Sequence, residues 1–577
     1  MKKIFIPIAV AVIGAAAYFS QQQDANYNVL NYVPADTPIF AGQLTPFPIK
    51  DYINSGAHLI TPADQDKLDA LYDASAKDSP AFHFLTSLLK TYQASAKDAD
   101  LLVKTFGLAD NVRAYFYTLG LLPVLKIEVA DPQAIWTLLD KKELETGFSH
   151  TEEKIQDLTY RSYEISQPDA TTKVELVVAQ ADGILTLTIN TDIVSNNLLA
   201  TALGLNKPDT SLADTNTLQD IIQQHSFSDA SVGFINHIEI IKGLTTTNGN
   251  QLAEQLTTIA KQDNSDPLAQ LHTATCQSEM ASIAQNWPRT VFGYTKIDIT
   301  QEHSTVAFAT IIESKNKVIL DALKAMRGFI PNYTQEFDKN VIATSLGLDV
   351  SQLSTSLTSI WKDLQTPTYQ CAPLAEIQSK ISQSGQSLAM LGLGSNMAAS
   401  VKGISAGIFD YAVSKIDEQP QLDNVDALVA IHTDNPEMIF NSIKMFSPEL
   451  QNVQLVNNGP AVSLNKIYPI PEKLHLDPKL AIKGQHLVIY NGNKGQQEAE
   501  KLSLEKLSAI GLYQASFDAK KMLSPIINAA AIAGDVIPEE AMFLMEYNAG
   551  MNINLDVNDQ GIRFDTIANH ESPQKNN

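Results

Sequence analysis

Cysteine and basic residues are both scarce in this chain of 577 residues. It contains two cysteines, which stand too far apart in sequence to form a CxxC redox pair or a local chelating pair. Lysine and arginine total 41 against 64 aspartates and glutamates, which gives a formal net charge of -23. Because such a charge repels phosphate backbones, the composition argues against nucleic acid as a partner.

Recognisable catalytic and cofactor signatures are also missing. The sequence has no Walker loop, no EF-hand loop, no kinase signature and no HExxH zinc motif. We therefore predict no catalytic, cofactor-binding or metal-binding residues, and we expect a protein that is not an enzyme.

One long apolar run is present, at the N-terminus. Lys2 and Lys3 precede the apolar segment 4–19, and polar residues follow it. The positive charges stay on the cytoplasmic side, so the pattern predicts export of everything that follows. A run of 16 residues is shorter than the roughly 20 of a spanning helix, and small residues near its end suit a signal peptidase, whereas two aromatic residues after them suit an anchor. Residues 1–23 are therefore a signal peptide or a signal anchor, and we expect a periplasmic protein, free or anchored to the inner membrane by 4–19.

The two cysteines, Cys276 and Cys371, lie inside the portion predicted to be exported. In an oxidising compartment an isolated pair favours a disulfide. On the chain-entropy model a loop of this length would stabilise the fold by about 4 to 5 kcal/mol. Two separate buried thiols are the alternative interpretation.

The same order of predicted elements occurs twice along the chain. A strand followed by a helix that begins at a proline is predicted at 122–136 and again at 427–440, with Pro132 and Pro436 in the first turn, where a helix tolerates proline. A second strand and helix, then a short strand with a helix, then a hairpin follow in both parts, at 184–200 and 486–502, at 231–242 and 512–523, and at 293–311 and 551–567.

We therefore predict an α+β fold of two duplicated halves, residues 24–335 and 336–577. The hairpins imply a mainly antiparallel sheet in each half, with helices on one face. Helical insertions are predicted at about 50–108 and 345–418, where apolar residues recur at helical spacing.

One catalytic pattern is present in its letters. Residues Gly403–Gly407 fit GxSxG, the turn that exposes the nucleophile of α/β-hydrolases, with Ser405 as the serine. No buried strand is evident before it, so the alternative is a helix whose two small residues let another element approach closely.

Three histidines stand two residues before a carboxylate. On a strand this spacing places both side chains on one face, where they suit a metal ion or an acid–base pair. None has the sequence context of a zinc site, so solvated polar faces are the alternative. The pairs are His237 with Glu239, His432 with Asp434, and His475 with Asp477.

An aromatic segment, Tyr115–Tyr117, precedes the apolar Leu121–Pro123. These residues suit either the lining of an apolar pocket or the packing of a core, which is the commoner use of such side chains.

The predicted mature chain opens with Tyr32–Pro38, which reads YVPADTP. Together with Gly120–Val124 and the stretch from Cys276 to Arg289, this segment resembles a family of uncharacterised exported bacterial proteins with a V/L-P-A-D-T-P motif. The resemblance implies a bacterial envelope location and brings no catalytic residue with it. Asp36 and Thr37 lie between two prolines that restrain the backbone, so they either cap a turn or act functionally.

These features lead us to expect an exported envelope protein that acts as a binding or assembly module, with an unknown envelope protein as its partner. The second hypothesis is a periplasmic carrier or chaperone that holds an apolar ligand between two similar halves. The third is a serine hydrolase that uses Ser405.

Overall fold

The computed structural model describes residues 29–571 except 56–61, 167–171, 263–264, 301–302, 386–387, 389, 391–393, 396–397, 417–418, 472–474, 533–536 and 538–547. The predicted leader, with its apolar run 4–19, lies outside the described residues. Among the helices that are described, none combines the length and the apolarity needed to cross a bilayer.

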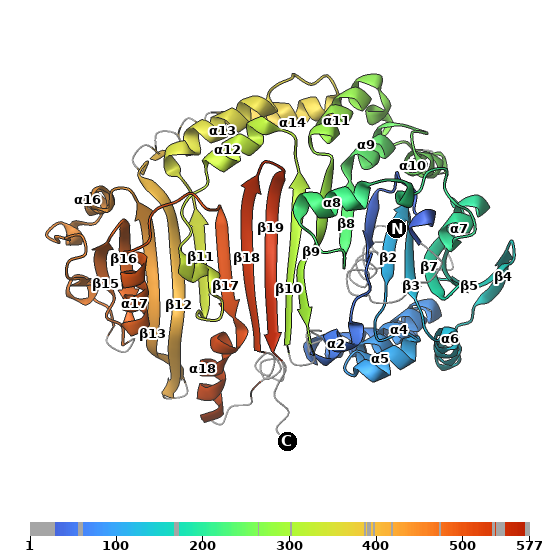
Figure 1. Ribbon diagram of the computed structural model, residues 1–577, viewed down its shortest axis with the longest axis horizontal. Coiled ribbons are helices and arrows are strands. Elements are labelled where there is room, and N and C mark those ends of the chain that lie inside the picture. Colours follow the sequence, from blue (N-terminus) through green and yellow to red (C-terminus); the bar gives the residue numbers. More distant parts are fainter. Residues whose placement is uncertain are drawn as a thin grey trace. The chain divides into compact units, whose positions relative to one another are not determined.

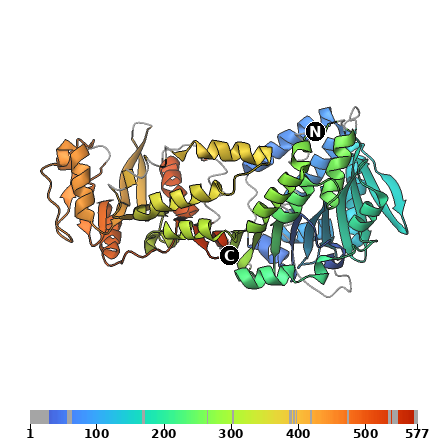
Figure 2. The ribbon, with the colours of Figure 1, turned by 90° about the horizontal axis from the view of Figure 1, so that it is seen from above.

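The chain forms two compact units, and helices and antiparallel strands occur in both. The first unit comprises Met1–Glu313 and Gln370–Pro373, and the second comprises Ser314–Tyr369 and Leu374–Asn577. Their elements can be followed in Figures 1 and 2. The α+β class and the antiparallel pairing predicted from the sequence are confirmed.

The sheet of the first unit is antiparallel throughout its described strands. Its order is β10-β9-β8-β1-β2-β3-β7-β6-β5-β4 (Figure 1). The central strands are β1 (Ile39–Gly42), β2 (Ala114–Leu119), β3 (Leu122–Glu128) and β7 (Ile184–Thr191). Outside them lie β8 (Val232–Asn236), β9 (Arg289–Ile299) and β10 (His303–Glu313) on one side, and β6 (Val174–Ala181), β5 (Leu158–Glu164) and β4 (Thr151–Ile155) on the other.

Helices cover both faces of this sheet, so the prediction of helices on one face is wrong. Helices α4 (Pro80–Ser95) and α6 (Pro132–Thr146) pack on the face that carries Val178 and Leu185. Helices α7 (Asn196–Leu203) and α8 (Thr217–His225) pack on the opposite face. The central strand β2, AYFYTL, is buried at every position, as expected for a strand that has cover on both sides.

The remaining helices of the first unit connect these strands. Four of its described helices, including α4, lie between β1 and β2, in the stretch where a helical insertion was predicted. Besides α4, these four are α2 (Ile49–Asn54), α3 (Pro62–Asp78) and α5 (Ala99–Phe106). Helices α9 (His237–Thr245), α10 (Gln251–Gln262) and α11 (Ala274–Asn286) lie between β8 and β9.

The two helices predicted to begin at Pro132 and Pro436 both form, and α3 and α4 begin at a proline as well. In α6 the side chain of Asp131 accepts a hydrogen bond from the Gln133 N–H, and Pro132 occupies the first turn. In α16 (Pro436–Phe446) the side chain of Asn435 accepts from the Met438 N–H. Proline has no N–H to leave unpaired at this position, so it fixes where each helix begins.

The second unit contains another antiparallel sheet, ordered β14-β15-β16-β13-β12-β11-β17-β18-β19 (Figure 1). Its strands are β11 (Ile342–Gly347), β12 (Val401–Ile416), β13 (Gln419–Thr433), β14 (Val462–Ser463), β15 (Lys479–Lys483), β16 (His486–Asn491), β17 (Tyr513–Asp518), β18 (Asn548–Asn558) and β19 (Gly561–Glu571).

Helices lie on both faces of the second sheet as well. Helix α17 (Gly492–Leu502) packs against Ala430 and Val488. Helix α16 packs against Leu480 and Leu487, which point to the other face of the sheet. The other named helices between residues 314 and 571 are α12 (Lys317–Ala325), α13 (Val350–Leu364), α14 (Ala372–Ser382) and α18 (Ala519–Ile532).

The prediction of a helical region over 345–418 is wrong for residues 401–416, which form strand β12. Here Gly403, Ser405 and Gly407 occupy alternate positions and are buried, whereas Ile404 between them is 49% exposed. The small residues therefore follow the period of a strand, and their four-residue interval arises from two steps of that period.

The predicted disulfide is confirmed. Cys276 on α11 is bonded to Cys371, with 4.7 Å between their Cα atoms. The carboxylate of Glu279, on the same helix, accepts hydrogen bonds from the backbone N–H groups of Gln370 and Cys371. The bridge therefore fixes the short segment Gln370–Pro373 to the first unit.

Candidate functional site

The segment Pro34–Pro38 is fixed at the start of β1 by hydrogen bonds to two other parts of the first unit. The Ala35 N–H donates to the Thr210 carbonyl at 3.0 Å. The buried Thr37 hydroxyl donates to the Thr118 carbonyl at 2.7 Å and accepts from the Thr118 N–H at 3.3 Å. Thr37 thus joins the motif to the end of β2, while Asp36 beside it is only partly exposed to solvent.

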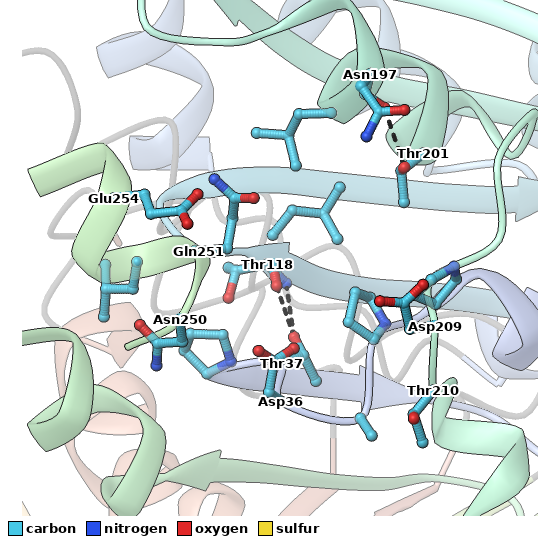
Figure 3. A pocket seen from close by; sticks show the side chains of 18 of the residues that line it. Asp36, Thr37, Thr118, Asn197, Thr201, Asp209, Thr210, Asn250, Gln251 and Glu254 are labelled. Carbon is cyan, nitrogen blue, oxygen red and sulfur yellow. Dashed lines mark hydrogen bonds between the residues drawn. The ribbon is translucent and has the colours of Figure 1, made fainter. Parts of the chain in front are cut away.

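A pocket of about 650 Å³ opens beside this segment, within the first unit (Figure 3). The motif and the end of β2 form one part of its wall. Helix α7 and the loop after it form a second part, and the loop before α10 forms a third. The lining residues are Pro34, Ala35, Asp36, Thr37, Pro38, Thr118, Leu119, Gly120, Ser195, Asn197, Leu198, Thr201, Asn206, Lys207, Pro208, Asp209, Thr210, Asn248, Gly249, Asn250, Gln251, Leu252 and Glu254.

Gln255 braces the wall between β2 and α10. Its buried side chain accepts from the Leu121 N–H at 2.5 Å and donates to the Leu119 carbonyl at 3.0 Å. The turn between them contains Gly120 at a φ of +63°, where a Cβ atom would lie 2.2 Å from Gln255 Oε1. Only glycine fits this position without displacing the brace.

The charge of the pocket is acidic. Three carboxylates line it, those of Asp36, Asp209 and Glu254, against one ammonium group, that of Lys207. The Lys207 Nζ atom lies over the Tyr32 ring, 5.8 Å from the ring centroid. Partial burial and the nearby Glu239 carboxylate raise the pKa of Asp36, because both disfavour its charged form.

The Thr118 hydroxyl is a buried polar group without a partner. Thr118 is 8% exposed, and its Oγ1 atom makes no hydrogen bond to any described residue. Such a group costs free energy unless a ligand or water satisfies it. Figure 3 shows Thr118 next to Thr37, among the residues that line the pocket.

A second cluster of polar side chains lies in the second unit, around Ser405. The Ser405 Oγ atom on β12 lies 2.7 Å from His432 Nε2 on β13. The Nδ1 atoms of His432 and His486 are 2.8 Å apart, and His486 belongs to β16. The Tyr333 hydroxyl donates to Ser405 Oγ at 2.7 Å. The structure thus joins two sequence candidates, Ser405 and His432, that belong to unrelated motifs.

The hydrogen-bond partners determine which ring nitrogen of each histidine carries a proton. The carbonyl of Glu505, 3.4 Å from His486 Nε2, only accepts, so Nε2 carries the proton and His486 Nδ1 accepts from His432 Nδ1–H. His432 Nε2 then accepts from the Ser405 hydroxyl. Burial lowers the pKa of both imidazoles, that of His486 to about 4.

The burial of this cluster argues against an exposed nucleophile. Ser405 is 4% exposed, and both histidines are 0% exposed. Ser405 also lies within a strand and not on the sharp strand-to-helix turn that its motif requires. The arrangement therefore acts as a buried hydrogen-bond chain that connects three strands.

The three histidine–carboxylate pairs have other roles. His237 contacts the Trp287 carbonyl and the Thr290 hydroxyl through its two ring nitrogens, and Glu239 accepts from Asn250. His432 belongs to the buried chain, and the Asp477 side chain accepts from Ser463. Among the described residues, no group of three or more histidine, cysteine, aspartate or glutamate side chains is arranged to hold a metal ion.

The aromatic segment before residue 118 belongs to the core. Tyr115 and Tyr117 are buried in the large cluster on one face of the first sheet, and Phe116 is buried on the other. Opposite Tyr115 lies Lys126, a 1% exposed lysine whose Nζ donates to the Thr186 hydroxyl at 3.0 Å. Sequence reasoning missed Lys126, although a lysine in an otherwise apolar strand was a visible signal.

The pocket itself was only partly visible in the sequence. Asp36 and Thr37 were candidates, but Thr118, Asp209 and Glu254 were not. Their segments show no motif spacing, and these three residues, from a strand, a loop and a helix, come together only in the folded chain.

No family model and no curated protein matches this chain. Among solved structures, crystal form I of TP0453 aligns with 51% of this chain and 81% of its own chain, at 10% sequence identity and a TM-score of 0.21. A likeness at that score supports no inference about fold or function.

Proposed function

We propose that this chain is an exported envelope protein that acts as a binding module, and that its ligand site is the pocket beside Asp36. One observation carries the proposal. The pocket is large enough for a small ligand, and one of the residues that line it, Thr118, has a buried hydroxyl that no described residue satisfies.

The chemistry of the pocket favours binding over the other hypotheses. A carrier of an apolar ligand needs apolar walls, whereas amide, hydroxyl and carboxylate groups supply most of the functional groups that line this pocket. A serine hydrolase needs an accessible nucleophile, whereas Ser405 is buried with its histidine partner.

A bulky side chain in the pocket tests the proposal. Asn197 on α7 is exposed and lines the pocket, so Asn197→Trp should fill part of it. We expect native mass spectrometry of the full chain, purified from its own cells, to show a bound small molecule in the wild type. The variant should lose that molecule.

Asn196→Trp is the matched control, because Asn196 is an exposed neighbour on the same helix that does not line the pocket. This variant should retain the bound molecule. The same molecule on both variants, or none on the wild type, would contradict the proposed site.

Two features support export. The apolar run 4–19 follows two lysines, and the Cys276–Cys371 disulfide is of a kind that persists in oxidising compartments. The disulfide gives a prediction that can be measured directly. Protein isolated from cells under denaturing conditions, with free thiols trapped at lysis, should contain no free thiol, and reduction should release two. Two free thiols before reduction would count against both the bridge in vivo and the envelope location.

We also propose that the two units are copies of one ancestral domain. The strand orders support this. We compared the two sheets strand by strand, starting in each unit from the last strand of its final hairpin. Eight consecutive strands correspond: the order in the first unit is β10-β9-β8-β1-β2-β3-β7-β6, and the order in the second is β19-β18-β17-β11-β12-β13-β16-β15. Helices α6 and α16 follow equivalent strands, as do α7 and α17, and α9 and α18. A shared chain path of this length argues for gene duplication more than for convergence.

A further inference from the structure

We infer that the pocket beside Asp36 binds a small polar ligand that carries a primary ammonium group. The inference rests on the proposed function, because it assigns a chemical class to the ligand of that same site. It follows from the charge of the pocket, from the unsatisfied hydrogen-bonding groups and from the residue types that the lining lacks.

The carboxylates come from three separate segments. Asp36 belongs to the motif segment, Asp209 to the loop after α7, and Glu254 to the first turn of α10, and all three are at least partly exposed to solvent (Figure 3). No described residue forms a salt bridge with any of them. A cationic ligand could therefore bind these three carboxylates without first breaking a salt bridge within the protein.

The nearby lysines already have partners of their own. Lys207 lies over the Tyr32 ring, and Lys242 lies 3.5 Å from a carboxylate oxygen of Glu239. Neither amine forms a salt bridge with a carboxylate that lines the pocket. The charge of Lys242 lowers the pKa of Asp36, but burial and Glu239 raise that pKa by more.

The buried Thr118 hydroxyl is independent evidence for a ligand. Its Oγ1 atom can donate one hydrogen bond and accept others, so a ligand amine, hydroxyl or amide would satisfy it. Amide side chains line the same space, including those of Asn248 and Gln251, which make no hydrogen bond to a described side chain. A ligand that bears several donors and acceptors matches these groups.

The lining lacks the groups that other ligand classes need. It contains no phenylalanine, tyrosine or tryptophan, so it offers no ring to stack on a planar aromatic ligand. Its net acidic character opposes phosphate and carboxylate ligands. Its volume of about 650 Å³ suits a molecule the size of a disaccharide or a short polyamine.

A matched pair of ligands tests the inference on the wild-type protein. The β-1,4-linked disaccharide of glucosamine carries two ammonium groups, and its N,N′-diacetyl counterpart has neutral acetamides at the same positions. By isothermal titration calorimetry at low salt, we expect the amine form to bind at least about tenfold more tightly than the diacetyl form, because hydrogen bonds between charged groups are the stronger ones. Spermidine serves as a second cationic probe that has no hydroxyl groups.

Charge-removing variants locate the interaction. The double variant Asp36→Asn/Glu254→Gln keeps the shape of both side chains and should weaken amine binding by about tenfold, because each exposed carboxylate contributes modestly. Its affinity for the diacetyl form should not change. Asp157→Asn, which neutralises an exposed carboxylate in the turn between β4 and β5, should bind like the wild type.

The outcomes separate the two proposals. Equal binding of both disaccharides, no binding of either cationic probe, or full amine binding by the double variant would overturn the ammonium assignment. If Asn197→Trp still removed a co-purified molecule in that case, the pocket would stand as the ligand site and only the ligand class would be wrong. If Asn197→Trp removed nothing, the proposed function itself would fail.

Discussion

Replacing Lys126 with methionine should raise the free energy of unfolding at pH 7 by about 3 kcal/mol. Lys126 is 1% exposed on β3, and among the described residues its Nζ atom contacts no carboxylate. Burial lowers the pKa of its ammonium group to about 7. The folded chain therefore holds this amine at a cost that an apolar side chain of similar length avoids.

The sign of the pH dependence follows from this shift. The pKa in the folded state lies below the ordinary value of 10.5, so the unfolded chain binds more protons between pH 7 and 10.5. Wild-type stability therefore falls as the pH drops through this window, by about 4 kcal/mol in total. Methionine leaves the Thr186 hydroxyl without its partner, which costs about 1 kcal/mol and gives the net gain stated.

Urea unfolding of the full chain at pH 7 and at pH 10 measures both effects. The advantage of Lys126→Met over the wild type should be large at pH 7 and close to zero at pH 10. Lys154→Met, at an exposed position on β4, should change stability by less than about 0.5 kcal/mol at either pH. Destabilisation by Lys126→Met at both pH values would show that the amine contributes more through its hydrogen bond than it costs by burial.

Acidification from pH 7 to pH 4 should destabilise the chain through the His432–His486 pair. Burial lowers the pKa of His432 well below its usual value, helped by the neighbouring His486, and it lowers that of His486 to about 4. The unfolded chain binds more protons than the folded chain between pH 4 and 6.5, so this stability is present above pH 6.5 and is lost as the pH falls. His486 alone accounts for roughly 3 kcal/mol.

Difference measurements isolate this contribution from that of the titrating carboxylates. His486→Asn keeps an acceptor near the Nδ1 position and removes the titrating ring, so its stability should fall less steeply between pH 6 and pH 4. The difference from the wild type should be about 1.4 kcal/mol per pH unit, the value for one proton. Ser405→Ala removes the hydroxyl but keeps both imidazoles, so it should retain the wild-type slope. Equal slopes for the wild type and His486→Asn would contradict the assignment.

The elements that the sequence predicted well are those that local rules determine. Pro132 and Pro436 fix where two helices begin, and the predicted hairpin at 551–567 forms around a turn at Asn558–Gly561. The disulfide was predictable because the chain offers a single possible pair. In each case a few neighbouring residues, or the absence of alternatives, determine the structure.

The features that the sequence did not predict depend on contacts between distant segments. Residues 401–416 contain small residues that satisfy a helical and an extended spacing equally well, and pairing of β12 with β11 and β13 decides between them. The same pairing brings Ser405 to His432. The pocket combines Thr118 with residues more than 70 positions away, so no local pattern identifies Thr118 as part of a site.

The path of the chain through the first unit bears on how the protein is made. The main part of that unit ends at Glu313. Residues Ser314–Tyr369 belong to the second unit, and the short segment Gln370–Pro373 after them belongs to the first unit again. A nascent chain therefore exposes Cys276 for the synthesis of 95 further residues before its partner exists. A product truncated anywhere in that interval would carry a solitary thiol, free to cross-link with another copy.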